Sequence, residues 1–367
     1  MALDPTGSQA LGRAAVSGNN QSVRTMAETS TLAPLKRWAR GMAKSVAART
    51  GGVRLYHRLR DREALTVIML HRVLPRAVYE AMQPDPCYTI STELLRSLVA
   101  FLRANYTIVG LSAVLDARRG ARPLPPHPVL ITFDDGWDDN LRYAAPIFSE
   151  LGVPWTLFVA AGAVGVSGAW WQETLLKALR TGRASYSELW RMASTETPEP
   201  QTERAPALLT AFGALDAPRR DAILAPFRDG KSNPDMADWN GLRALDNYTS
   251  VGAHGFSHLP LTMLDDPARD LSQARELLRS HLGPGATASM SFPHGRYDAK
   301  ILAATRALGF ELIFTSDAVL NSCPGGWLSQ DTMGRISVEE SQVCDRNGEF
   351  DPGQAERWLM LRKRQAA

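Results

Sequence analysis

Short apolar runs alternate with amphipathic segments along most of the chain, and this rhythm predicts an α/β protein. The strand-like runs cover residues 65–73, 106–111, 128–133, 154–160, 248–255, 286–295 and 310–316. Helical periodicity lies between them, in residues 91–105 with Ser91 as the expected N-cap, 140–152 ended by Gly152, and 298–309 ended by Gly309. Nearly continuous apolar strands separated by helices favour a parallel sheet covered by helices. Barrels of this type carry their chemistry at the carboxyl ends of the strands.

Residues 173–245 break this rhythm. Two helical stretches, "ETLLKALRTGRASYSELWRMAS" and "ALLTAFGALDAPRRDAILAPFRD", are joined by the polar "TETPEPQTERAP". We therefore expect a helical insertion that can wall or cap a cleft. The 22 uncharged residues 151–172 are long enough to raise the question of a membrane span. Pro154 and several glycines favour a buried strand followed by a loop instead, so no span is predicted.

The N-terminal part of the chain is expected to lie outside the barrel. Residues 1–31 are small and polar and lack the apolar core of a secretory signal, so we expect a disordered tail, with Met26 as an alternative translation start. Residues 32–63 form a basic lead-in, and residues 33–60 within it carry eight Lys and Arg side chains. Two readings stay open for this segment: attachment to an anionic membrane surface, or a solvated helix that leads into the domain.

The composition is that of an ordinary globular protein, with 44% hydrophobic and 22% charged residues among 367. A formal charge of +3 without a nucleic-acid-binding motif argues against nucleic acid as a partner. The three cysteines, Cys87, Cys323 and Cys344, lack C-x-x-C spacing, which argues against a disulfide framework or a cysteine zinc site. We expect a cytoplasmic protein, which would sit at the inner face of the membrane if residues 33–60 attach there.

Two pairs of polar residues end predicted strands and carry the candidate chemistry. Asp134 and Asp135 are adjacent, so both lose hydration and repel each other. His254 and His258 have a spacing that would place both imidazoles on one side of a helical turn. Two imidazoles and one carboxylate make a three-ligand site with room for water, as catalytic zinc requires, and the second carboxylate can then serve as base. Taken singly, the Asp pair also fits a turn and the His pair an exposed surface.

Three short motifs occur in a fixed order: "TFDDG" at 132–136, "HGFSH" at 254–258 and "FPHG" at 292–295. Together with "VIMLHRV" and "VPWTLFVAAG" they resemble the NodB-type polysaccharide deacetylases, the carbohydrate esterase family 4 kind. The resemblance implies a distorted (β/α)7-type barrel, a divalent metal that is usually zinc, and hydrolysis of an N-acetyl group on an amino sugar. We accordingly place the barrel at residues 64–345, with the helical insertion inside it, and a C-terminal helix or tail at residues 346–367.

The resemblance also implies roles for individual residues. By position, Asp134 is the general base, and the backbone N–H of His294 helps to hold the oxyanion. The implied metal ligands are Asp135, His254 and His258. The substrate side of the pocket is expected to include Trp137, Pro293, Gly295 and Arg335, and Trp170 and Trp171 could also offer apolar faces to a pyranose ring.

Three departures from the family pattern affect these roles. Gly255 stands where a Ser or Thr commonly braces the second motif. The arginine that usually precedes the third motif is missing from "TASMSF", and no histidine follows His294 to serve as the usual acid. His71 and His294 are the candidates for the general acid. Arg335 or Arg72 is the candidate for the group that tunes Asp134.

The favoured function is a metal-dependent hydrolase that removes an N-acetyl group from an amino sugar of a polysaccharide or its precursor, in cell-surface or exopolysaccharide synthesis. Two alternatives stay open. One is a catalytically weak, glycan-binding barrel, and the other is a hydrolase of another non-peptide C–N bond on the same scaffold. An N-acetylated carbohydrate is the expected partner of the favoured function.

Overall fold

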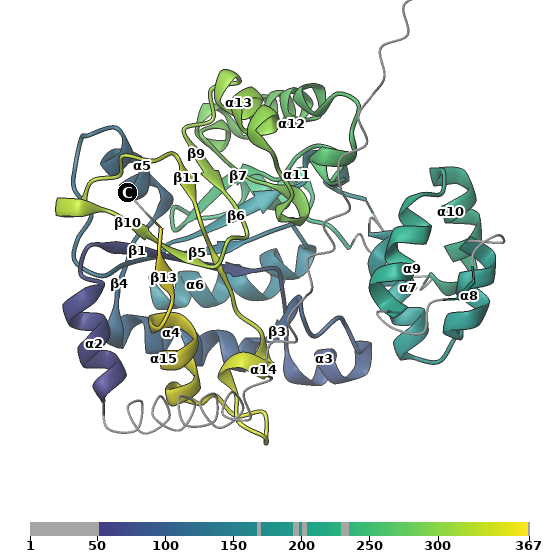
Figure 1. The fold of residues 1–367 in the computed structure, drawn as a ribbon, viewed down its shortest axis with the longest axis horizontal. Helices are drawn as coiled ribbons and strands as arrows, with labels where there is room; N and C mark the ends of the chain where they lie inside the picture. The colour runs from purple at the N-terminus through teal and green to yellow at the C-terminus, as the bar shows by residue number, and fades with distance from the viewer. Residues whose placement is uncertain (1–50, 167–169, 194–197, 200–203, 229–234, 366–367) are drawn as a thin grey trace, which may run out of the picture. The chain divides into compact units, whose positions relative to one another are not determined.

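The structure is a computed structural model that describes residues 51–166, 170–193, 198–199, 204–228 and 235–365 (Figure 1). The predictions for residues 1–50 therefore concern residues outside the described part of the chain. Six parallel strands form the centre, each paired with the next in the order β1 (Ala64–Leu70), β5 (Pro128–Phe133), β6 (Trp155–Val159), β7 (Thr249–Ala253), β8 (Ser289–Ser291) and β9 (Leu312–Phe314).

A bent segment closes this sheet into a barrel. Its first part, β11 (Thr332–Met333), pairs in parallel with β9, and its second part, β12 (Ile336–Ser337), pairs in parallel with β1. The two ends of the six-stranded sheet are thereby joined through one short stretch of chain. This arrangement confirms the distorted seven-unit barrel that the sequence predicts.

The side chain of Asn321 stabilises the closure of the barrel. It lies on β10 (Val319–Ser322), which pairs antiparallel with β1, and it is fully buried. Its amide nitrogen donates to Leu65 O (3.2 Å) and Gly334 O (2.9 Å), and its oxygen accepts from the Gly334 N–H (2.7 Å). One buried amide therefore satisfies three backbone groups at the point where the bent segment turns between β11 and β12.

Helices cover the outside of the barrel, as Figure 1 shows for α4, α6, α12 and α13. The helices outside the insertion are α2 (Gly52–Arg60), α3 (Arg76–Met82), α4 (Thr92–Asn105), α5 (Leu111–Arg118), α6 (Ala145–Leu151), α11 (Trp239–Arg243), α12 (Pro267–Leu282), α13 (Ala299–Ala307), α14 (Glu340–Val343) and α15 (Pro352–Met360). The Ser91 side chain accepts from the Leu94 N–H at the start of α4, as predicted for an N-cap. Two further short strands sit at the edges, β4 (Thr107–Ile108) beside β5 and β13 (Lys363–Arg364) beside β10.

The strand predicted over residues 65–73 is wrong at its C-terminal end. β1 stops at Leu70, and after His71 the chain continues as β2 (Arg72–Leu74), which pairs with β3 (Thr89–Ser91) in a separate two-stranded sheet. The physical reason is that backbone groups beyond His71 find partners outside the barrel, beginning with the Arg72 N–H on Tyr88 O (2.8 Å). His71 thus lies where the chain leaves the carboxyl-terminal edge of the barrel.

The helical insertion has its own apolar core. It comprises α7 (Trp171–Arg180), α8 (Tyr186–Ala193), α9 (Arg204–Gly213) and α10 (Ala217–Leu224). Leu175, Leu189 and Phe212 are fully buried among these helices. The first predicted helical stretch is divided between α7 and α8 by a turn that begins at Thr181.

Residues 151–166 complete α6 and form β6 and a short 3-10 turn (Ala161–Ala163), as expected for a strand followed by a loop. Among the described residues, no helix combines the length and the apolar character that crossing a bilayer requires.

We predict that Asn321→Leu destabilises the barrel strongly. The substitution keeps the volume but leaves Leu65 O, Gly334 O and the Gly334 N–H buried without their partner, which should lower the free energy of unfolding by more than about 3 kcal/mol. Urea denaturation measures this change. Asn347→Leu, at an exposed position, serves as the control and should change stability by less than about 0.5 kcal/mol. Equal losses in the two variants would contradict the role given to Asn321.

Candidate active site

The first motif makes a tight turn at the carboxyl end of β5. The Asp134 N–H still donates to Leu70 O (2.9 Å) on β1, which continues the sheet by one residue. Asp135 then has φ +76° and Gly136 φ +83°, so the backbone reverses direction within two residues. A Cβ at Gly136 would also lie 3.0 Å from Val159 Cγ1, which explains why glycine follows the aspartates. The turn sends the two adjacent carboxylates to different partners.

The second motif is a braced loop, and the predicted helical turn between His254 and His258 is wrong. Residues 254–258 are not helical, Gly255 has φ +71° and His258 has φ +57°. The buried carboxylate of Asp270 on α12 accepts from the N–H groups of Phe256 (2.8 Å) and Ser257 (2.9 Å). Asp270 therefore braces the loop in which Gly255 replaces the usual Ser or Thr, and no sequence signal had pointed to it.

The loop brings three donor side chains together. Asp135, His254 and His258 are buried, and one ligand atom of each lies within 4.8 Å of the others. Asp135 Oδ1 is 3.0 Å from His258 Nε2 and 3.4 Å from His254 Nε2. Two imidazole nitrogens and one carboxylate oxygen are a donor set suited to zinc and related divalent ions, and it leaves a coordination position for water. The side chains present thus fit a metal ion.

A second set of contacts orients these donors. Ser291 O accepts from His254 Nδ1 (2.9 Å), which directs Nε2 toward Asp135. Trp137 Nε1 donates to Asp135 Oδ2 (2.9 Å), so the other carboxylate oxygen is already held. The Trp137 ring lies under the guanidinium of Arg72 (4.0 Å), which in turn pairs with the buried Asp139 (2.8 Å). Trp137 is buried and holds the Asp135 carboxylate, and its predicted place on the substrate side stays a prediction.

The pKa values of the donor groups follow from their mutual contacts. Burial alone would raise the pKa of Asp135, but the His258 charge and the hydrogen bonds from both imidazoles hold it well below its ordinary range. Burial opposes a charge on His254 as well, yet Asp134 and Asp135 raise the pKa of this imidazole. In the ion-free protein, protons thus compete with a metal for these groups as the pH falls.

Asp134 has a separate counter-ion, Arg335. Its two carboxylate oxygens each accept from one terminal nitrogen of this guanidinium at 2.7 Å, and both side chains are almost fully buried. The Ser291 hydroxyl accepts from Arg335 (2.7 Å) and donates to Asp134 (3.1 Å). Burial alone would raise the pKa of Asp134, and the arginine together with His254 outweighs it, so the pKa lies below its usual value. Arg335 is thus the cation that lowers the pKa of Asp134, while Arg72 pairs with Asp139. A contact of Arg335 with substrate stays a prediction.

Two further histidines lie beside the donor group. His71 is partly buried, with its ring edge against Tyr88 (4.9 Å between ring centres), and burial lowers its pKa against the opposing charges of Asp135 and Asp134. His294 has φ +56° and its Nε2 lies 3.1 Å from His258 O. The His294 residue is exposed, but the protein atoms that crowd its ring and the His258 charge lower its pKa to about 4. Both rings are therefore neutral near pH 7 without an ion.

The other residues predicted to line the substrate pocket, Pro293 and Gly295, lie in the third-motif loop. Pro293 is buried next to Gly255, and Gly295 (φ +64°) has no room for a side chain because a Cβ there would lie 2.4 Å from Ser316 Oγ. Both therefore shape the third-motif loop. Trp170 lies over the His258 ring at 3.8 Å, and Trp171 stacks on Phe212 in the core of the insertion. Tyr88, which the sequence analysis missed, is 53% exposed beside His71.

The insertion reaches this region through its first helix. Trp170, which contacts His258, directly precedes α7, and Glu173 in the first turn of α7 lies 4.0 Å from the Arg72 guanidinium. Arg180 at the end of α7 pairs with Asp85 (3.6 Å) and donates to Gln83 O (3.2 Å). One end of the insertion therefore borders the three candidate metal donors.

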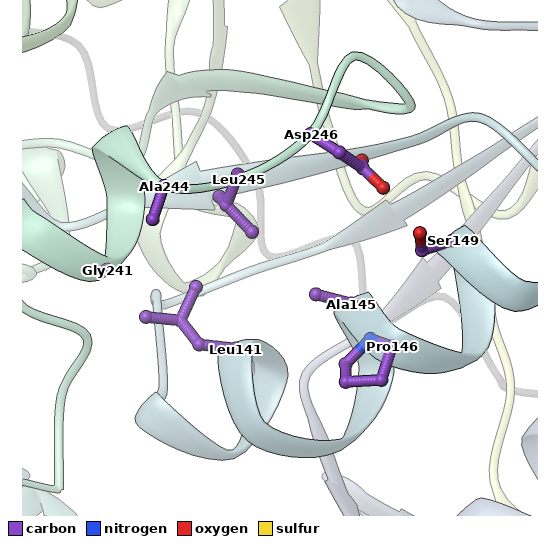
Figure 2. Close-up of a pocket in the computed structure, with 8 residues that line it drawn as sticks. All are labelled: Leu141, Ala145, Pro146, Ser149, Gly241, Ala244, Leu245 and Asp246. Carbon is purple, nitrogen blue, oxygen red and sulfur yellow. The ribbon is translucent and has the colours of Figure 1, made fainter.

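A separate hollow of about 410 Å³ lies between the segment that runs into α6 and the segment around α11 (Figure 2). Its walls are mostly apolar, with Leu141 and Leu245 facing each other across it and Asp246 at one side. None of the donor residues lines it. This hollow is thus distinct from the candidate active site.

Comparison with known proteins finds a family that resembles part of the chain. The family model described as "Polysaccharide deacetylase" matches residues 121–204 and 229–313, and the gap between the two matched parts falls in the helical insertion. These two parts of the chain are similar to the polysaccharide deacetylase family. The matched residues include the aspartates of the first motif, the histidines of the second and the whole third-motif loop.

The relatives differ in how much of the chain they cover. The poly-beta-1,6-N-acetyl-D-glucosamine N-deacetylase of Escherichia coli K12 is 36% identical over 67 residues, which are 18% of this chain and only 10% of that protein. Among solved structures, IcaB from Ammonifex degensii matches with a TM-score of 0.51 at 20% identity, over 81% of this chain and 97% of its own. Streptococcus pyogenes deacetylase PplD gives 0.51 at 14% identity, over 81% and 98%. At these identities the structural likeness shows the shared fold.

We predict that Arg335→Met destabilises the protein by about 3–5 kcal/mol, because it leaves the Asp134 carboxylate buried without its counter-charge. The double variant Asp134→Asn/Arg335→Met should lose less stability than the sum of the two single variants. Arg119→Met, which breaks an exposed pair with Glu311, is the control and should have little effect. Urea denaturation at pH 7 measures the free energy of unfolding. A loss in the double variant equal to the sum of the two single losses would contradict the pairing.

The same variants should respond to pH in a defined direction. The lowered pKa of Asp134 means that its ion pair stabilises the wild type above the unfolded-state pKa of about 4, and this contribution is lost as the pH falls through the folded-state value. In Arg335→Met the opposing cation is gone, so burial raises the pKa and protonation relieves the unpaired charge. The stability difference between the two proteins should therefore narrow on acidification. A difference that is constant with pH would count against this assignment.

We predict that Trp137→Phe weakens metal binding about 10–100-fold, because it removes the N–H that orients Asp135 while keeping a ring beside Arg72. A titration of the purified protein with Zn²⁺ against a chelator measures the affinity. Trp327→Phe, at a 40% exposed position away from the donors, is the control and should leave it unchanged. Equal affinities for both variants would exclude the orienting role of Trp137.

Proposed function

We propose that the protein is a divalent-metal-dependent hydrolase that removes the N-acetyl group from an amino sugar of a polysaccharide or its precursor. The proposal rests on the observation that two adjacent carboxylates have different partners. Asp135 belongs to a three-donor group, and Asp134, one residue earlier, is kept ionised by Arg335 and free of that group. An ionised carboxylate beside a metal site is what a general base requires.

Zinc is the ion that the two-histidine, one-carboxylate donor set favours. When bound, such an ion supplies Lewis acidity, which polarises a carbonyl and lowers the pKa of water. Asp134 then accepts a proton from the attacking water. The N–H of His294, at the left-handed turn of the third motif, donates to the oxygen that becomes negative. The products are acetate and the free amine of the sugar.

We assign the general acid to His71. No hydrogen bond from another described residue engages its ring, so it can turn to a leaving amine, whereas the His294 ring is held at the His258 carbonyl. The position of His71, one residue after β1, puts it on the same barrel edge as Asp134. Its pKa is lowered in the ion-free protein, and it must gain a proton during the reaction, which the neighbouring carboxylates favour.

The substrate proposal rests on the relatives. The match to the Escherichia coli enzyme covers a tenth of that protein, so β-1,6-linked N-acetylglucosamine is offered as the first substrate to test. The exposed Tyr88 ring beside His71 could support a pyranose face. We further propose that the enzyme acts on the cytoplasmic side of the membrane, on a polymer or a precursor.

The decisive experiment compares an amide with an activated ester. Wild type should release acetate from N-acetylglucosamine oligomers in the presence of Zn²⁺ and also hydrolyse 4-nitrophenyl acetate. Asp134→Asn should lose about 10²–10⁴-fold on both substrates, because both need an activated water. His71→Ala should lose a similar factor on the amide and only a few-fold on the ester, because 4-nitrophenolate leaves without protonation.

Each outcome distinguishes one alternative. If His294→Ala shows the amide-specific loss and His71→Ala does not, the acid is His294. If the oligomers bind but no acetate is released, the protein is a glycan-binding barrel. If acetate is not released but another C–N bond is cleaved, the scaffold carries a different hydrolase.

A further inference from the structure

The helix α2 exposes apolar side chains to solvent. Leu55 is 59% exposed, Tyr56 45% and Leu59 77%, within a helix of nine residues. Scattered single exposed leucines are ordinary on protein surfaces, but here three large apolar side chains share one short helix. The helix packs on α15, and no role in deacetylation explains its exposed apolar side chains.

The arrangement around the helix axis is ordered. Val53 and His57 face the protein and are 2% and 1% exposed, and His57 Nδ1 lies 3.1 Å from the buried Asp61 Oδ2. At 3.6 residues per turn, Leu55 and Leu59 stand four positions apart on the side opposite these two anchors. The leucines therefore form the outermost ridge of the helix, where a purely solvated helix would carry its charges.

Arginines lie along one side of this ridge and Tyr56 along the other. By helical position, Arg54 and Arg58 flank it on one side. Arg54 pairs with the buried Glu356 carboxylate, and Arg60, nearer the protein, pairs with Asp61 (2.6 Å) and donates to the Tyr56 hydroxyl (2.8 Å). Arg58 makes no ion pair with another described residue. An apolar ridge beside an arginine that pairs with no described carboxylate, and whose long stem can bend toward phosphate groups, is the pattern of a helix that lies in a membrane interface.

The surroundings strengthen the positive charge. Arg364, on the exposed strand β13, donates to Arg60 O (3.1 Å), which brings it and Lys363 beside the last turn of α2. In the sequence, no acidic residue occurs between Glu28 and Asp61, whereas this stretch holds eight Lys and Arg residues. Basic residues near an anionic surface each add to the attraction between protein and membrane.

We propose that the ridge of Leu55, Tyr56 and Leu59, with the arginines beside it, docks on an anionic lipid bilayer. A polyanion without apolar surface would leave the leucines without a partner. A second copy packed on the same ridge by two-fold symmetry would set arginine against arginine. A bilayer with anionic headgroups accommodates both the apolar ridge and its basic edges.

The docking surface also suits the rest of the barrel. The chain after α2 lies at the amino-terminal ends of the strands, where Arg62 O accepts from the His127 N–H (2.9 Å) just before β5. The candidate active site lies at the carboxyl ends. A membrane bound through α2 would therefore leave the cleft uncovered. This inference does not depend on which bond the site hydrolyses.

The test is co-sedimentation of the full chain with vesicles of phosphatidylcholine alone or with 30% phosphatidylglycerol. Wild type should bind the anionic vesicles and not the neutral ones. Leu55→Gln/Leu59→Gln should bind the anionic vesicles at least tenfold more weakly, with an unchanged thermal midpoint because both side chains point away from the core. The matched control is Met192→Gln/Met263→Gln, which removes two apolar side chains that are 45% and 60% exposed elsewhere and should bind like wild type.

Three results would overturn the proposal. Wild type that binds neither kind of vesicle, or both equally, would exclude an anionic bilayer as the partner. Undiminished binding by Leu55→Gln/Leu59→Gln would show that the leucines of α2 do not contact the bilayer and that the attraction is purely electrostatic. Sedimentation velocity without lipid tests whether a second copy of the chain occupies the ridge. A wild-type dimer that dissociates in Leu55→Gln/Leu59→Gln would make the ridge an interface between copies.

Discussion

Two adjacent carboxylates at the end of a buried strand must stay ionised, and the rest of the site depends on how the fold stabilises their charges. Asp134 and Asp135 are 2% and 8% exposed, so water cannot stabilise them. The fold gives each its own partners: a paired guanidinium for Asp134, and two imidazoles and an indole N–H for Asp135. The left-handed turn at Asp135 and Gly136 makes this separation possible, because it directs neighbouring side chains to opposite partners.

This solution assigns the family's usual tasks to residues at other positions. The arginine that commonly precedes the third motif is absent, and Arg335 reaches the same carboxylate from the segment that closes the barrel. The Ser or Thr of the second motif is replaced by Gly255, and Asp270 supplies the brace from a helix. In both cases the requirement is physical, a cation against a buried carboxylate or an acceptor for loop N–H groups, and any element that reaches the place can meet it.

The two ends of the barrel then serve different purposes. At the carboxyl ends of the strands, the donor group is bordered by the first helix of the insertion through Trp170 and Glu173. At the amino-terminal ends, α2 is fixed by the buried His57 and Asp61 and presents leucine and arginine outward. Chemistry and the proposed attachment are thus built on opposite edges of one sheet, where neither constrains the other.

The amino-acid sequence by itself determined the strands, most of the helices and the four residues with the clearest chemistry. Continuous apolar runs and helical periodicity are local signals, and two carboxylates at a strand end leave few explanations. The tertiary structure decided what those residues touch. Arg335 pairs with Asp134 across 201 positions, His254 and His258 meet through a braced loop instead of a helical turn, and Trp137 donates to Asp135. Such contacts depend on how the barrel closes, which involves residues far apart in the chain and leaves no local pattern to read.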